Sequence, residues 1–202
     1  MKRNQKLALG LAIIIVITGC STPSTSLFDG KTLDGWECDP PELASNWFVE
    51  NGELVGENPE EEASLLWTTQ SFTDFEVELE YMTLSKDYDS GLFLRAISHQ
   101  AQIGISRSLE KDMTGCIYAP SDEQGSYPGQ TDKVAEFHRI GEWNHLKVII
   151  SGKQIQTILN GEPFVDYEAI NIPDEGPVGL QLHGGVHMKV NFRNITLREL
   201  SE

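Results

Sequence analysis

Histidine and arginine side chains mark two places in this sequence that could support chemistry. His183 ends an apolar run and is followed by Gly184-Gly185, and its imidazole can act as a base or a hydrogen-bond donor near neutral pH. His187 follows that turn by two residues, so we expect it to lie nearby. Arg95 follows an apolar strand segment, where a cation needs a partner. It is therefore either a charged group of a functional site or half of a structural ion pair.

Glutamine and tryptophan side chains could bind a polar ligand. Gln100 and Gln102 stand two residues apart, and a side-chain amide both donates and accepts hydrogen bonds. Trp143 offers a flat ring that suits the C–H face of a sugar, although tryptophan more often packs in a core. The remaining histidines are expected on solvated faces: His99, His138 and His145.

Acidic side chains gather in two short segments. Glu76, Glu78 and Glu80 alternate along one strand, which indicates either a solvated outer face or a glycosidase-like set of acids. The solvated face is preferred because the extra residue that such a set uses before its last acid is absent. Asp87 and Asp89 form either a plain acidic turn or a calcium contact, and the turn is preferred.

The elements that must position these residues follow a period of two. Residues 75–82 are the clearest half-buried strand, and 145–150 and 155–159 repeat the pattern around a turn at 151–153. Asn51-Gly52 and Asn160-Gly161 predict tight hairpins, because both central turn positions need positive φ. Further strands are predicted at 47–50, 53–56, 65–69, 91–97, 102–106, 115–118, 178–183 and 189–197.

About a dozen short strands without a sustained helical period predict an all-β antiparallel β-sandwich. The stretches 37–46, 57–64 and 119–143 are rich in proline, glycine or acids and are predicted as long loops, with one helical turn within 132–140. Loops of a sandwich gather at the sheet rims, where binding residues usually lie.

The N-terminus predicts export. Lys2, Arg3 and Lys6 precede an apolar run at 7–17 that is too short to cross a bilayer comfortably. The run ends at Ile17-Thr18-Gly19-Cys20, which resembles the lipobox of bacterial lipoproteins. We therefore expect a signal peptide over 1–19, a lipid on Cys20 that anchors the protein to a membrane, a flexible tether to residue 26 and one domain over 27–202. No aspartate follows the cysteine, which favours the outer membrane, with the periplasmic or surface side left open.

Charge and cysteines limit the function further. The chain has 15 basic and 31 acidic residues, and removal of residues 1–19 would leave a formal charge of −19. Such a negative field repels nucleic acid, so no nucleic-acid partner is expected. After lipidation of Cys20, Cys38 and Cys116 remain, either as a disulfide or as two small buried side chains.

Several segments together resemble the bacterial 3-keto-disaccharide hydrolase family, also described as 3-keto-glycoside hydrolase or lyase-like. They cover nearly all of the mature chain and occur in the family's order: 27–36, Asp74-Phe75-Glu76-Val77, Ser90-Gly91-Leu92-Phe93-Leu94-Arg95, 115–118, Glu142-Trp143-Asn144, 159–161, 176–184 and Phe192-Arg193-Asn194-Ile195. The resemblance implies a concanavalin-like jelly roll. One position departs from the family, because Gln100 stands where a carboxylate is expected and Ser106 lies near a second missing acid.

The resemblance implies cleavage of 3-keto-glycosides. The 3-keto group acidifies the C2 proton, a base removes it, the glycosidic oxygen leaves C1, and water adds later. Arg95 and His183 are then the expected catalytic groups, with Gln100, Gln102, Trp143 and His187 binding the oxidised glycoside. A divalent metal ion could replace the cationic donor at the ketone as a Lewis acid.

Two other functions remain open at this stage. A lectin-like module that binds glycans without cutting them is consistent with Gln100 and with a surface tether. A structural envelope lipoprotein is consistent with the anchor and the acidity alone.

Overall fold

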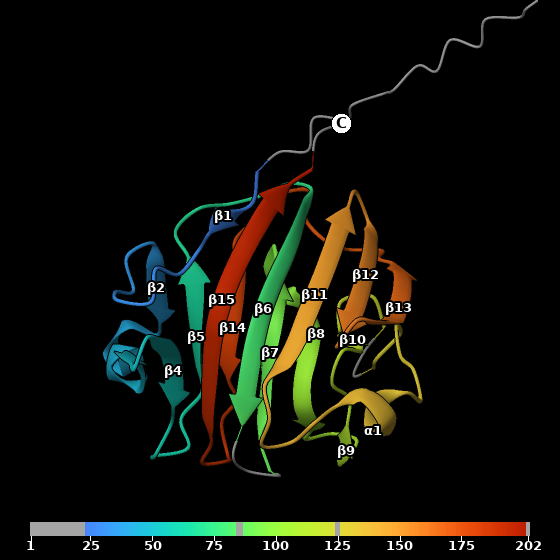
Figure 1. Ribbon diagram of the computed structural model, residues 1–202. Helices are drawn as coiled ribbons and strands as arrows, with labels where there is room; N and C mark the ends of the chain where they lie inside the picture. Colours follow the sequence, from blue (N-terminus) through green and yellow to red (C-terminus); the bar gives the residue numbers. More distant parts are fainter. Residues whose placement is uncertain (1–22, 84–86, 124–125, 201–202) are drawn as a thin grey trace, which may run out of the picture.

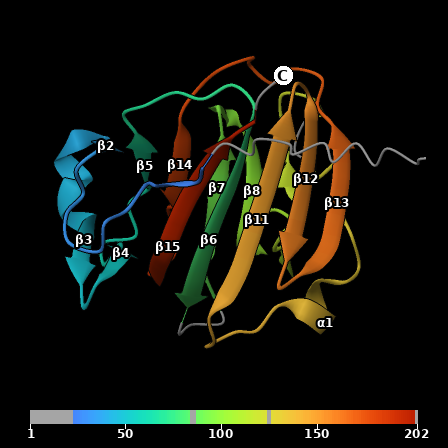
Figure 2. The ribbon, with the colours of Figure 1, turned by 45° about the horizontal axis from the view of Figure 1, so that its top comes forward.

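Two antiparallel β-sheets packed face to face form the domain (Figure 1, Figure 2). The computed structural model describes residues 23–83, 87–123 and 126–200, so the predicted signal peptide and Cys20 lie outside the described residues. The first sheet has the order β13-β12-β11-β6-β15-β4-β3, with β1 beside β15. The second has the order β10-β8-β7-β14-β5-β2, with β9 beside β8. The predicted sandwich is therefore confirmed.

The strands have the following bounds. The first sheet contains β1 (Thr25–Ser26), β3 (Trp47–Glu50), β4 (Glu53–Glu57), β6 (Phe75–Thr83), β11 (Asn144–Ser151), β12 (Gln154–Leu159), β13 (Glu162–Glu168) and β15 (Lys189–Glu199). The second contains β2 (Trp36–Asp39), β5 (Ser64–Thr68), β7 (Asp89–Leu94), β8 (Ala96–Ser106), β9 (Lys111–Asp112), β10 (Ile117–Tyr118) and β14 (Val178–Leu182). Two short helices, η1 (Pro41–Asn46) and α1 (Val134–Phe137), lie in the connections.

The core lies between the sheets and follows the alternation of the sequence. On β6, Phe75, Val77, Leu79 and Tyr81 are fully buried. Burial of each such side chain contributes about 1.5–3 kcal/mol, so this face of β6 fixes the register of the strand. On the second sheet, alternate residues of β7 and β8 face the same core, including Leu92, Leu94, Ala101 and Ile103. The residues between them must therefore face away from the first sheet.

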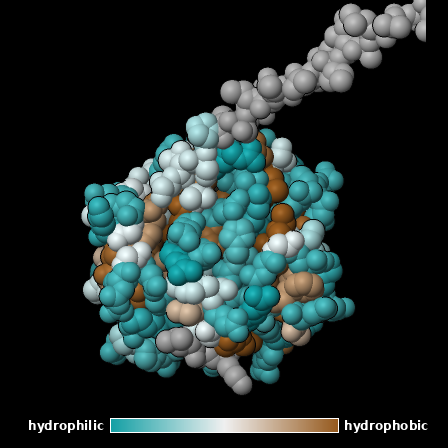
Figure 3. Space-filling view, in the orientation of Figure 1, coloured by the Kyte–Doolittle hydropathy of each residue, from teal (hydrophilic) through white to brown (hydrophobic). Residues whose placement is uncertain are grey.

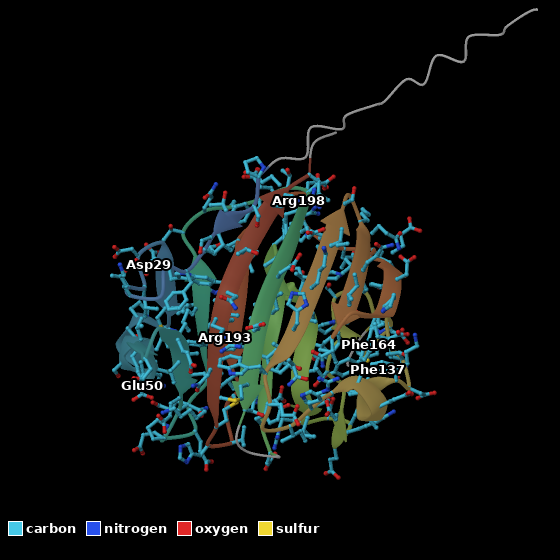
Figure 4. The ribbon with its side chains drawn as sticks, in the orientation of Figure 1. Asp29, Glu50, Phe137, Phe164, Arg193 and Arg198 are labelled. Carbon is cyan, nitrogen blue, oxygen red and sulfur yellow. The ribbon has the colours of Figure 1, made fainter. Side chains whose placement is uncertain are left out.

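The outer face of the first sheet is a charged surface, as predicted. Lys147 lies 2.8 Å from Glu76 Oε1 and 3.1 Å from Glu78 Oε1. Arg193 and Arg198 of β15 pair with Glu80 and Glu76 at 2.6 and 2.8 Å. Figure 3 shows hydrophilic side chains over this face, and Figure 4 shows Arg193 and Arg198 along β15. The three glutamates thus form ion pairs on a solvated face.

Two edge strands differ from the sequence-based prediction. Residues 162–168 form β13 although Pro163 interrupts them, and residues 36–39 form β2 within an acidic stretch that was predicted partly as a loop. Both are the outermost strands of their sheets. An edge strand needs hydrogen bonds on one side only, so it tolerates proline and charge that a central strand would not.

The predicted tether differs from the structure, and the structure decides between the two states left open for the cysteines. Thr25 and Ser26 pair with Leu197 and Thr196, so the folded domain begins before residue 27. Cys38 lies on β2 and Cys116 beside β10, at opposite ends of the second sheet, and both are free thiols. Among the described residues, no helix is long and apolar enough to cross a membrane.

Candidate active site

One pocket of about 470 Å³ lies on the face of the second sheet that points away from the core. Its floor comes from β7, β8 and β14, and its walls come from the segment between β8 and α1. The lining residues are Asp89, Phe93, Ile97, Ser98, Gln100, Gln102, Ser106, Arg107, Ser108, Tyr118, Pro120, Ser121, Tyr127, Gln181 and His183. The pocket therefore combines one carboxylate, one arginine, one histidine and three amides.

The three amides form one hydrogen-bonded chain that starts at Asp89. Gln102 Nε2 donates to Asp89 Oδ1 at 2.7 Å, and Gln102 Oε1 accepts from Gln100 Nε2 at 3.0 Å. Gln100 Nε2 also lies 3.0 Å from Gln181 Oε1 and 3.1 Å from the Ser90 carbonyl oxygen, so its two hydrogens are shared among three acceptors. Asp89, Gln100 and Gln102 are almost fully buried. Such a connected network holds each side chain in one orientation.

The charge on Asp89 decides which way every amide points. A carboxylate only accepts hydrogen bonds, so Gln102 must turn its NH₂ group toward Asp89 and its oxygen toward Gln100. Gln100 must then turn its NH₂ group toward Gln102 and Gln181. Among the described residues, no protein group bonds Gln100 Oε1 or Gln181 Nε2. One acceptor and one donor are thus left for a ligand.

Gly91 makes the position of Gln100 feasible. A Cβ atom at Gly91 would lie 2.0 Å from Gln100 Nε2, closer than any real contact. Gly91 is the neighbour of Gln102 across the β7–β8 pairing, and Phe93 is the neighbour of Gln100. The missing side chain therefore opens the space through which Gln100 reaches the other two amides.

Arg107 supplies the positive charge of the pocket. Its Nε lies 3.6 Å from Asp89 Oδ2, and its backbone N–H donates to the same oxygen at 3.2 Å. The guanidinium also pairs with the exposed Asp87. Asp89 is therefore fixed on both oxygens, which suits an anchor for the amides better than a mobile base.

His183 follows β14 and lines the same pocket. Its backbone N–H donates to the Asp89 carbonyl at 3.2 Å, which places the two residues side by side on neighbouring strands. Its ring Nδ1 lies 2.6 Å from the Gly184 carbonyl oxygen. Because a carbonyl only accepts, Nδ1 carries the proton in the neutral ring, and Nε2 keeps its lone pair. The ring is thereby arranged to accept a proton at Nε2.

The structure brings three of the predicted site residues together: Gln100, Gln102 and His183. Arg95 does not join them. Its side chain is buried and donates to the carbonyl oxygens of Thr73, Gly152 and Pro173, and it pairs with Asp74 at 2.9 Å. Burial lowers the pKa of Arg95, and Asp74 opposes that effect. Of the two roles left open by the sequence, the contacts are those of the structural ion pair.

Trp143 and His187 also lie outside the residues that line the pocket. The Trp143 ring packs under the Arg193 guanidinium, 3.8 Å from ring centre to carbon, on the charged outer face of the first sheet. His187 is exposed, and its Nε2 lies 3.8 Å from Glu57 Oε1. His187 is close to His183 in sequence but lies away from the pocket, because the chain leaves the second sheet after Gly184-Gly185.

Two predicted surface histidines are buried. His99 is fully buried and its Nε2 lies 2.9 Å from Asp122 Oδ2. His138 lies 2.6 Å from Asp112 Oδ2 through Nδ1 and 2.7 Å from the Tyr88 hydroxyl through Nε2. The prediction failed because each histidine has a carboxylate partner from a distant segment, which permits burial.

Sequence reasoning missed Asp89, Arg107 and Gln181 as site residues. A signal existed for two of them. Extending the strand from Gly91 back by two residues puts Asp89 on the face of Gly91, and Gln181 shares the face of His183 by the same period. Arg107 follows the strand end and carries no comparable signal.

The pocket offers few metal ligands. Within the described residues, no group of three or more His, Cys, Asp or Glu side chains is placed to hold a metal ion. Asp89 is the carboxylate that lines the pocket, and both of its oxygens are already bonded to protein donors. This donor set does not fit a site for a divalent metal ion.

The two antiparallel sheets define the fold class as a jelly roll of the galectin and lectin type. The chain belongs to the family described as 3-keto-alpha-glucoside-1,2-lyase-like domain, which matches residues 23–198. No curated protein matches the chain.

Solved structures with the same fold are distant in sequence. Two structures from Parabacteroides distasonis, each described as a "putative glycosyl hydrolase", are 21% and 24% identical, with TM-scores of 0.67 and 0.65. They cover 88% of this chain each, and 94% and 100% of the other chains. The carbohydrate-binding module CBM66 from Bacillus subtilis is 14% identical, with a TM-score of 0.54, over 82% of this chain and 96% of the module. At this identity the likeness shows the fold alone.

Proposed function

We propose that this protein cleaves 3-keto-glucosides by removal of the C2 proton, elimination at C1 and later hydration. The observation that carries the proposal is His183, which lines a pocket together with three oriented amides and whose Nδ1 proton is held by the Gly184 carbonyl. Membership of the lyase-like family supports the same chemistry. The amides supply donors and acceptors of the kind that bind sugar hydroxyls.

His183 is the proposed base. The C2 proton of a 3-keto-glucoside is acidic because the neighbouring ketone accepts the charge of the enolate. His183 Nε2 takes that proton, and the Gly184 carbonyl holds the proton on Nδ1 in place. The imidazolium so formed then holds the proton that the departing glycosidic oxygen needs. Proton removal and release thus balance on one side chain.

Arg107 and Gln181 are the proposed partners of the ketone oxygen. Arg107 brings a positive charge, and Gln181 Nε2 brings a donor whose direction the amide chain has fixed. Donors already oriented toward a developing negative charge need no rearrangement during the reaction. This assignment replaces Arg95, whose donors are used by backbone carbonyls.

Tyr127 is a further donor in the pocket. Burial raises the pKa of its hydroxyl, so the group keeps its proton across the neutral range. The hydroxyl contacts Ser106 at the Asp89 end of the pocket, so its O–H can donate to a hydroxyl of the bound sugar.

The test is a panel of purified 3-keto-glucosides incubated with the protein, with and without divalent metals. We expect release of the aglycone, which chromatography and mass spectrometry would detect. His183→Gln should lower the rate at least about 100-fold, because general-base catalysis contributes about 10²–10⁴-fold. An intact substrate panel under all conditions would refute the proposal.

A glycan-binding role without cleavage is the second candidate. The position of Gln100 favours it, because this amide stands where the family's carboxylate is expected and participates in a network suited to hold sugar hydroxyls. Binding of 3-keto-glucosides or of glycans with no turnover would support this role instead.

We also propose that the protein acts at the cell envelope, held by a lipid on Cys20. The apolar run and the Ile17-Thr18-Gly19-Cys20 segment support this proposal, and both lie outside the described residues. Metabolic labelling with a radioactive fatty acid tests it. Label that persists in Cys20→Ser would contradict it.

A further inference from the structure

The pocket is longer than one sugar ring, and its two ends differ in chemistry. Asp89 is the neighbour of Gly104 and Phe93 is the neighbour of Gln100 across the β7–β8 pairing, so the floor runs along β8 from Ser106 toward Ser98. Phe93 pairs with Gln100 and Leu94 with Ala96, so residues 97–99 bulge from the pairing and carry Ser98 beyond the amides. A sugar over Gln102, Gln181 and His183 therefore leaves the Ser98 end unfilled.

The far end, which we name the distal subsite, is mostly apolar. It is lined by Phe93, Ile97, Ser98, Tyr118, Pro120 and Ser121. Ile97 is 66% exposed, although a large apolar side chain gains stability from burial. Tyr118 packs against Tyr127 with ring centres 5.1 Å apart, so this wall is held in place.

A second sugar would fit the distal subsite poorly. It would bring several hydroxyls, yet the side-chain polar groups there are the hydroxyls of Ser98, Ser121 and Tyr118. Hydroxyls that lose water without gaining partners weaken binding. An aromatic ring would instead cover Ile97 and Phe93 and lose no hydrogen bonds.

The hydroxyl oxygen of Ser98 in the distal subsite is held by a buried series of hydrogen bonds. Ser98 Oγ lies 3.0 Å from His99 Nδ1, and His99 Nε2 lies 2.9 Å from Asp122 Oδ2. Asp122 also accepts from the Tyr167 hydroxyl and from the backbone N–H of Ile170, both at 2.8 Å. Burial opposes ionisation of Asp122, but these hydrogen bonds outweigh it and hold its pKa well below the ordinary value.

The hydrogen bonds from Asp122 through His99 determine whether Ser98 Oγ donates to a ligand or accepts from it. In its neutral form the His99 ring directs its Nε2 proton to the Asp122 carboxylate and keeps its lone pair on Nδ1. Nδ1 then accepts the Ser98 hydroxyl proton, and the Ser98 oxygen presents its lone pairs to the pocket. In this arrangement Ser98 Oγ accepts a hydrogen bond from the ligand, for example from a hydroxyl on an aromatic ring.

We propose that the distal subsite binds the aglycone of the substrate and selects a hydroxylated aromatic ring. The proposal rests on the proposed function, since it names the substrate class of the same pocket. The glucoside ring lies over the amides, and the aromatic ring covers Ile97 and Phe93. The ring hydroxyl donates to Ser98 Oγ.

The test measures binding of three 3-keto-glucosides whose aglycones are methyl, phenyl and 4-hydroxyphenyl. Calorimetry on His183→Gln keeps the ligands intact. Burial of a phenyl ring should tighten the dissociation constant at least about tenfold over methyl. The ring hydroxyl should add a further factor of about three to ten.

Variants separate the two contributions. Ile97→Ser should remove most of the advantage of phenyl over methyl, and Ser98→Ala should remove only the advantage of the ring hydroxyl. Ile140→Ser is the matched control, because Ile140 is also an exposed isoleucine and does not line the pocket. It should leave all three dissociation constants unchanged.

The outcomes distinguish this inference from the proposed function. Equal dissociation constants for the three ligands, or an Ile97→Ser effect as large on methyl as on phenyl, would overturn the distal subsite. Failure of the wild-type protein to cleave any of them, with the order of affinities intact, would refute the lyase reaction and leave the subsite standing.

Discussion

Gln102 and Asp89 meet across neighbouring strands, where Gln102 Nε2 donates to Asp89 Oδ1 at 2.7 Å. This one contact orients the amides of Gln100 and Gln181 as well, because each passes its polarity to the next. The donor and the acceptor that the pocket leaves for a ligand are therefore set by the charge of Asp89, whose own oxygens are bonded to protein groups. Asp89 acts as a positioning residue.

Replacement of the proposed base tests the chemistry. His183→Gln removes the imidazole that can accept a proton at Nε2 while keeping a polar side chain. We expect the rate constant for cleavage to fall at least about 100-fold, with a change of less than about threefold in the dissociation constant for intact substrate. His145→Gln is the control, because His145 pairs with Glu78 on the opposite sheet and lies outside the pocket. An equal loss in both variants would exclude His183 as the base.

Gly91→Ala tests the space that Gln100 occupies. The new methyl group would overlap Gln100 Nε2, so we expect a loss of about 1–3 kcal/mol in the free energy of unfolding and weaker ligand binding. In the double variant Gly91→Ala with Gln100→Ala, the overlap is gone. Its unfolding free energy should then exceed the value expected from adding the two single effects, which a double-mutant cycle in denaturant measures. Simple additivity would contradict the contact.

Gln100→Glu restores the acid expected at this position in the family and should be costly here. The side chain would face the oxygens of Gln102, Gln181 and Ser90, and an ionised carboxylate cannot donate to them. The folded state therefore favours the protonated form, which raises the pKa of the new carboxyl. The loss of stability relative to wild type should be smallest at low pH and grow as the pH rises above the unfolded value of about 4.3. Thermal unfolding between pH 4 and pH 8 measures it, and a loss independent of pH would contradict the orientation of Gln100.

The lowered pKa of Asp122 predicts that the folded protein loses stability in acid. Its pKa is lowered in the folded protein, so the stability it contributes is present above the unfolded value of about 3.9 and is lost as the pH falls through the folded value. Asp122→Asn should cost about 2–4 kcal/mol at pH 7, because it leaves the His99 and Tyr167 partners imperfectly paired. The deficit relative to wild type should shrink as the pH falls below about 4. Chemical unfolding at pH 7 and pH 3 compares the two proteins, and a constant deficit would exclude the linkage.

Arg95→Met tests the structural role of that cation. The change leaves the carbonyls of Thr73, Gly152 and Pro173 without their donor, so we expect a loss of about 3–5 kcal/mol in the free energy of unfolding. Ligand affinity of the protein that remains folded should be unchanged, because Arg95 does not line the pocket. A large loss of affinity in a protein of normal stability would restore Arg95 to the site.

The sequence by itself determined the sandwich. The period of two along β6 requires one buried face and one charged face, and Asn-Gly pairs fix the turns because their backbone needs positive φ. It also determined that Gln100 and Gln102 share one face, because alternation keeps residues two apart on the same side of a sheet, whereas His183 joins them only because β14 pairs with β7.

Only the tertiary structure decided which polar side chains share the pocket. Arg95 and Trp143 have side chains that could bind a ligand, yet each is engaged by a distant segment. Arg95 donates to the carbonyl oxygens of Gly152 and Pro173, and the Trp143 ring packs against the Arg193 guanidinium. Asp89 and Arg107 enter the site because β7, β8 and β14 become neighbours, a relationship between segments up to about ninety residues apart. Local periodicity specifies the face on which a side chain lies, but the partner it meets depends on strand order, which no local pattern encodes.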